Sequence, residues 1–154
     1  MNDELYQYTS CGLPNVCLKN GYTVKETKYG KAVSIHNLEG LHRAIGLDIV
    51  RNKGALTGAE VRFLRKEMDL PQVQLADLLG VAESSVRNWE SSDDGRADIQ
   101  GPADRILRQM YLEYIKEEST LHDILERLTR LNRERHALEC LKFAESGGAW
   151  LAAA

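Results

Sequence analysis

The segment ESSVRNWE (83–90) brings hydroxyl, guanidinium and amide groups close together. Helical spacing would direct Val86 and Trp89 inward. Asn88 could then pair with adenine and Arg87 with guanine or a phosphate, although a solvated helix face would carry the same residue types. The carboxylate of Glu83, at the start of the helix, could accept a hydrogen bond from cytosine or repel a phosphate. It could instead stabilise the helix, because negative charge is favourable at a helix N-terminus. The polar candidates for contact with a nucleic acid are Glu83, Ser84, Ser85, Arg87 and Asn88.

The residues before this segment predict the helix that must position it. A helix beginning at Pro71 would bury Leu75, Leu78 and Leu79. Gly80 would end it, because glycine adopts the left-handed conformation of a tight turn, and Ala76 would let the two helices cross closely. Two helices joined by so short a turn form a helix-turn-helix, whose second helix can enter the major groove of DNA.

Two more helices are expected around this pair. Thr57 and Glu60 form a capping box at the start of the 56–70 segment, LTGAEVRFLRKEMDL, and Pro102 opens another helix that reaches Ile115. A polar loop, 91–101, lies between the 83–90 helix and the helix that begins at Pro102. It is long enough to be a contact element, and Arg96 is its candidate phosphate ligand.

The stretch FLRKEMDLPQVQLADLLGVAESSVRNWE resembles the Xre/Cro/lambda-repressor family of helix-turn-helix transcription regulators, over about residues 56–116. The resemblance implies DNA binding, with Gln72 on a backbone phosphate and the 83–88 positions facing the groove. Gln74 is a further candidate on the same helix. The resemblance also implies a buried structural ion pair between Arg65 and Glu90.

A narrower resemblance covers the N-terminal region. The stretches CGLPNVCLKNGY, YGKAVSIHNLEGLHRAI and LTGAEVRFLRKEMDL together look like MqsA-type antitoxin regulators. Those proteins carry an N-terminal β module, bind a toxin RNase and repress their own operon as dimers. Their zinc site uses two C-x-x-C pairs, whereas this chain has Cys11 and Cys17 at wider spacing. A zinc site completed by His36 and His42 is therefore not expected, and neither zinc nor toxin binding carries over with the resemblance.

The first 55 residues predict a small α+β module. The runs 22–27 and 32–36 alternate apolar and polar positions, which predicts a hairpin with one buried face, and shorter β-like runs precede them. A helix from Leu38 to Asn52 should lie on this sheet and end with Gly54 at its C-cap. We therefore expect an α+β fold in three segments: the module (1–55), a helix-turn-helix domain (56–116) and a C-terminal helical dimerisation segment (117–154).

Composition limits the possible functions. The net charge is -3, and residues 57–116 hold eight Lys and Arg against eleven Asp and Glu, which excludes a binder driven by bulk positive charge. No apolar run is long enough for a membrane span, the N-terminus MNDELYQYTS is acidic and polar where a signal peptide would be basic and then apolar, and three scattered cysteines suit a reducing compartment. We expect a cytoplasmic, nucleoid-associated protein without a cofactor, and no residue grouping predicts an enzyme.

The C-terminal segment predicts a helix contact. Its apolar residues keep a seven-residue repeat with one polar interruption, Arg135. A homodimer built on such a seam would suit a repressor that binds a palindromic operator in double-stranded DNA. Two alternatives remain: an antitoxin that binds a toxin protein through the β module, and an RNA-binding regulator, which the closed major groove of A-form RNA disfavours. The residues of the repeat are Leu121, Ile124, Leu128, Leu131 and Leu138.

Overall fold

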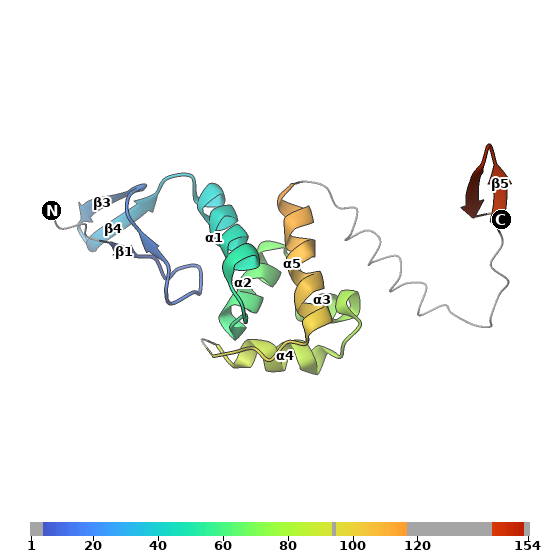
Figure 1. Cartoon of the computed structure of the whole chain (residues 1–154). Coiled ribbons are helices and arrows are strands. Elements are labelled where there is room, and N and C mark those ends of the chain that lie inside the picture. Colours follow the sequence, from blue (N-terminus) through green and yellow to red (C-terminus); the bar gives the residue numbers. More distant parts are fainter. Residues whose placement is uncertain (1–4, 94, 117–142, 153–154) are drawn as a thin grey trace.

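A computed structural model describes residues 5–93, 95–116 and 143–152 (Figure 1). Small β-hairpins precede a group of helices, so the predicted α+β class is confirmed. Within these residues, every helix is too short or too polar to cross a lipid bilayer. The elements are β1 (Tyr6–Gln7), β2 (Cys17–Leu18), β3 (Tyr22–Thr27), β4 (Gly30–Ile35), α1 (Leu38–Asn52), α2 (Gly58–Glu67), α3 (Gln72–Leu79), α4 (Glu83–Ser91), α5 (Gly101–Ile115), β5 (Phe143–Ser146) and β6 (Ala149–Ala152).

The core lies among the helices. Each helix from α2 to α5 has apolar residues on one face, and these faces meet out of water, which is the main driving force for the packing. The predicted capping box begins α2: the Thr57 hydroxyl accepts from the Glu60 amide, and the Glu60 carboxylate accepts from the Thr57 amide. The largest fully buried side chains are Tyr111, Leu56, Leu64, Leu75, Leu107, Met110, Val61 and Val86.

Helix α1 joins the helical group, which corrects the expectation that it lies on the β-sheet. It packs on α2 and α5, and Gly46 has no side chain where the phenol ring of Tyr111 approaches. The β1–β2 segment contacts the helical group through Leu13, which is buried in the same core as Ile49 of α1, and through the hydrogen bond between the Tyr8 hydroxyl and His42 Nε2 (2.8 Å). Helix α1 ends at Asn52, as predicted, and its C-cap is the extended residue Lys53 rather than Gly54.

The predicted hairpin β3–β4 forms, with Val24 opposite Val33 and Lys25 opposite Ala32. Its predicted buried face does not. Val24 and Val33 are 48% and 36% exposed, and only Tyr22 and Ile35, at the base, are partly covered. Each pair of strands is a separate two-stranded sheet, so in the described part of the chain no second layer covers this face.

The C-terminal segment differs from the expected helix where it is described. Residues 143–152 form the hairpin β5–β6, because Gly147 and Gly148 both take positive φ and permit a tight turn between the strands. The apolar repeat from Leu121 to Leu138 lies outside the described residues.

Candidate nucleic-acid interface

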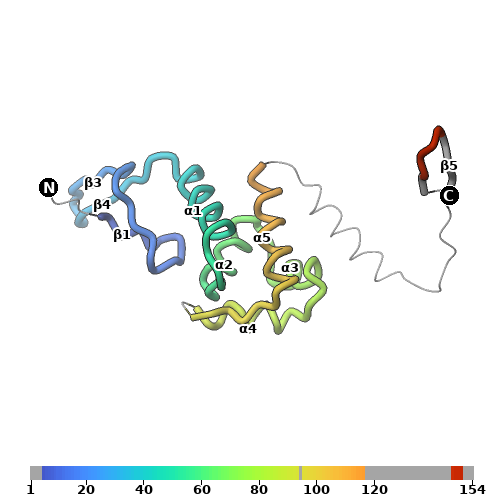
Figure 2. The backbone as a smooth tube through the Cα atoms, in the orientation of Figure 1, coloured from blue at the N-terminus to red at the C-terminus, as the bar shows by residue number. Residues whose placement is uncertain are grey.

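Helices α3 and α4 form two arms joined by a tight turn (Figure 2). Gly80 ends α3 in the left-handed conformation (φ 70°), and the Val81 amide donates to the Ala76 carbonyl across the turn. Leu75, Ala76 and Val86 are buried where the helices cross, as predicted. These contacts fix the angle at which α4 leaves α3.

The outer face of α4 carries a continuous polar stripe. Ser84, Arg87, Asn88 and Ser91 are exposed at positions i, i+3, i+4 and i+7, so they lie along one side of the helix. In the described residues, the side chains of Ser84 and Asn88 make no hydrogen bond or ion pair. Ser91 was not predicted, although its distance of seven residues from Ser84 is the sequence signal that places it on this face.

Glu83 and Arg87 are not independent groups. The Arg87 Nη1 atom lies 3.0 Å from Glu83 Oε1, in an ion pair that spans one turn of the helix. Both side chains are exposed, at 56% for Arg87 and 43% for Glu83. The stripe therefore has little net charge before it meets a partner.

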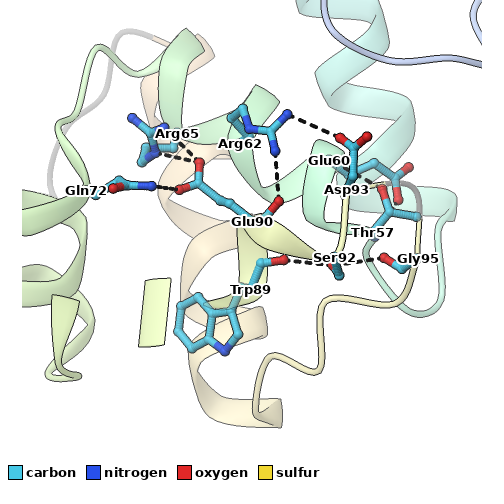
Figure 3. Close-up of polar contacts among 10 residues, drawn as sticks. All are labelled: Thr57, Glu60, Arg62, Arg65, Gln72, Trp89, Glu90, Ser92, Asp93 and Gly95. Carbon is cyan, nitrogen blue, oxygen red and sulfur yellow. Dashed lines mark hydrogen bonds and ion pairs between the residues drawn. The ribbon is translucent and has the colours of Figure 1, made fainter. Parts of the chain in front are cut away.

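The opposite face of α4 is held by Glu90, whose carboxylate is buried (Figure 3). Arg65 donates to Glu90 Oε1 through Nε (2.9 Å) and Nη2 (2.7 Å), and also donates to the Leu70 carbonyl. Gln72 Nε2 donates to the other oxygen, Glu90 Oε2 (2.6 Å). One carboxylate thus connects the C-terminal part of α4 with α2 and with the start of α3.

The side chain of Gln72 contacts Glu90 within the protein. The family resemblance implied a contact between Gln72 and a DNA phosphate, and that contact stays a prediction; in the structure one amide hydrogen of Gln72 is donated to Glu90. The side chain still lies at the N-terminus of α3, where backbone amides favour an anion. Gln74, two residues further along α3, is half-buried.

The loop after α4 is anchored to the start of α2. The Arg62 Nη2 atom donates to the Glu90 carbonyl, and its Nη1 lies 3.3 Å from Asp93 Oδ1 (Figure 3). The Gly58 amide donates to the Gly95 carbonyl, and a backbone bridge joins Thr57 to Arg96. Arg96 itself is exposed, next to this anchored strip of chain.

The residues considered for zinc are occupied elsewhere. His36 is hydrogen bonded to the Thr23 hydroxyl, and His42 Nδ1 lies 2.7 Å from Glu67 Oε1. Cys11 is half-buried, and Cys17 is exposed. The described residues contain no group of three or more His, Cys, Asp or Glu side chains that could hold a metal ion.

Comparison with known proteins agrees with this geometry. Residues 61–99, from α2 to the loop after α4, match a protein-family model described as Helix-turn-helix. The segment is therefore a helix-turn-helix, and the matching model is that of the Xre/Cro-type helix-turn-helix. No curated protein and no solved structure matched the chain. Helices α3 and α4 are the two helices that the short turn at Gly80 joins within the matched segment.

Proposed function

We propose that the protein is a sequence-specific transcription regulator that inserts α4 into the major groove of double-stranded DNA. The observation that carries this proposal is the polar stripe of α4, exposed along its whole length while the other face is fixed in the core. Hydroxyl, guanidinium and amide groups at this spacing can meet successive base edges. We assign base contacts to Ser84, Ser85, Arg87 and Asn88, with Ser91 near the end of the stripe.

We assign the contacts with DNA phosphates to side chains outside the polar stripe of α4. Gln72 keeps a second amide hydrogen for a phosphate while Glu90 fixes its direction, and Gln74 and Arg96 are the other candidates. The helix-turn-helix region has more acids than bases, so these contacts supply only a small gain from counterion release. Specificity then depends on hydrogen bonds at the base edges more than on bulk charge.

The regulator acts as a homodimer and represses its target in the cytoplasm, at the nucleoid. One helix as short as α4 reads only a few base pairs, and two copies related by a two-fold axis multiply the specificity. Two recognition helices about 34 Å apart would require a palindromic operator with half-sites about one helical turn apart. The Leu121–Leu138 repeat is the proposed dimer seam.

Selection from a randomised DNA duplex pool, followed by sequencing, tests this function. The expected product is an inverted repeat whose half-site centres lie about 10 base pairs apart. A chain with Arg87→Ala and Asn88→Ala should enrich no sequence while its circular dichroism spectrum stays that of the natural chain. Enrichment of the same repeat by this variant would refute the assignment to α4, and an RNA hairpin bound more tightly than the duplex would favour the RNA alternative.

A second candidate function is that of an antitoxin of the MqsA type, which binds its toxin through the N-terminal module. The uncovered apolar face of β3–β4, with Val24 and Val33 exposed, supports it. Co-purification with the product of a neighbouring gene tests it. The complex should form with the natural chain and fail with Val24→Thr plus Val33→Thr, while DNA binding is unchanged.

A further inference from the structure

The ion pair on the recognition helix has a role that its energy does not explain. Both partners are exposed, and an exposed ion pair at i, i+4 contributes little to the stability of a helix. The pair also lies on the surface assigned to DNA, where a carboxylate repels phosphates. Its place therefore suggests a function in recognition rather than in folding.

We propose that Glu83 is a positioning residue that fixes the guanidinium of Arg87 for one base and keeps it off the phosphates. This inference rests on the proposed DNA-binding function and assigns specificity within it. Glu83 begins α4, and Ala82 before it makes no side-chain cap, so the carboxylate lies at the open end of the helix. Its Oε1 atom takes the Nη1 edge of Arg87 at 3.0 Å.

The geometry of the guanidinium explains how one pair can set a preference. Arginine carries five N–H donors in a planar fork, and Glu83 occupies only one corner of it. The Nη2 and Nε donors remain free for a bidentate contact, which suits the O6 and N7 acceptors of guanine. Because the pair spans one turn, Arg87 is drawn towards the start of α4, and the Ser84 and Asn88 side chains beside it are exposed.

The alternative conformation of Arg87 shows what the carboxylate prevents. A free arginine on this helix could extend to the nearest phosphate, a contact that is the same for every sequence. With Glu83 present, that movement breaks an ion pair and brings the carboxylate towards phosphates without its counter-charge. Glu83 thus lowers the affinity for unrelated DNA more than the affinity for the operator.

The test compares full-length variants by selection on randomised duplex DNA and by titration on operator and unrelated duplexes. Glu83→Ala should relax the preference at one base pair of each half-site, with a loss of discrimination there of about fivefold or more. Binding to unrelated DNA should become tighter and more dependent on salt, with about one additional counterion released per protomer. Glu83→Gln keeps the length of the side chain but not its charge, and should fall between the natural chain and Glu83→Ala.

The double variant Glu83→Ala with Arg87→Ala separates positioning from direct reading. If Glu83 acts through Arg87, its removal changes no base preference once Arg87 is absent. Asp98→Asn is the matched control, because it removes one exposed carboxylate from the loop after α4 and should leave every base preference unchanged. Circular dichroism should report the same helix content for all of these chains.

Three results would overturn the proposal. One is an unchanged sequence preference in Glu83→Ala, and another is an equal change in the presence and absence of Arg87, which would make Glu83 a direct reader of the base. The third, a natural chain that selects no sequence, would remove the proposed function together with this inference. A natural chain that selects a site while Glu83→Ala selects the same one would refute only the inference.

Discussion

Replacing the buried carboxylate of Glu90 should destabilise the whole helix-turn-helix domain. In Glu90→Gln the shape of the side chain is kept, but Arg65, whose side chain is only 12% exposed, loses the charge that it pairs with. Breaking one partner of a buried ion pair costs about 3–5 kcal/mol. A domain of this size is stable by about 5–15 kcal/mol, so the variant should lose a large part of its free energy of unfolding.

Urea unfolding measures this loss directly. Trp89 packs in the core beside this network and reports on its unfolding, and the exposed Trp150 can be replaced by Phe in every chain so that Trp89 alone emits. A loss of 3 kcal/mol should lower the urea midpoint by about 1 M or more, since small proteins lose about 1–3 kcal/mol per molar urea. Asp93→Asn is the control, because its ion pair with Arg62 is largely exposed and should contribute less than about 1 kcal/mol.

A double-mutant cycle tests the physical reason. The double variant Arg65→Met plus Glu90→Leu removes both charges. Its loss of free energy of unfolding should therefore be smaller, by about 1–3 kcal/mol, than the sum of the losses in Arg65→Met alone and Glu90→Leu alone. If Glu90→Gln costs less than about 1 kcal/mol, or if the two single costs simply add, the carboxylate does not hold the domain together through Arg65.

Three further predictions concern the same domain. Gly58→Ala should destabilise the domain by about 1–3 kcal/mol in urea unfolding, because a Cβ there would meet the Trp89 carbonyl oxygen at 2.5 Å. Gly101→Ala, where a Cβ would point into open space, should not destabilise it, and equal costs for the two variants would contradict this reason. Burial, and then the charge of Glu67, raises the pKa of Tyr111 from 10.0 to about 12, so the stability that it contributes is complete below pH 10 and is lost as the pH rises to about 12. The free energy of unfolding should fall by about 1.4 kcal/mol per pH unit in that window, and Tyr111→Phe should remove this part of the fall; an unchanged slope would refute it. Thr57→Ala should raise the rate of amide exchange at the start of α2 and cost about 1 kcal/mol through the lost capping box, and an unaltered exchange rate would count against that role.

The helix-turn-helix could be predicted from the sequence because its local signals agree with its packing. Gly80, the capping box at Thr57 and the buried positions Leu75 and Val86 each have one physical role that the sequence states directly. The observed ends of α3 and α4 lie within one residue of the predicted ends. Local propensity, apolar spacing and turn chemistry all favoured the same structure there.

The N-terminal module was predicted less well because the residue pattern shows which face is apolar but not which element packs against it. The alternation in β3 and β4 indicates a face to be covered, but no residue in it says by what, and Val24 and Val33 are exposed. The spacing of α1 likewise predicts an apolar side without saying whether it meets a sheet or helices. The hydrogen bond from Gln72 to Glu90 was not predicted, since it depends on the final position of both helices, whereas the family resemblance did imply the ion pair between Arg65 and Glu90.

The most direct measurement is the affinity of the full-length protein for the DNA upstream of its own gene, by gel shift at about 100 mM salt. The control variant is Asp98→Asn, which alters the neighbouring loop only. The account predicts a tight, competitor-resistant complex with the natural chain and the control, and its loss with Arg87→Ala plus Asn88→Ala at unchanged circular dichroism. Equally tight, competitor-resistant binding by that double variant, or no sequence-selective DNA binding by the folded natural chain, would contradict the claim that α4 reads an operator.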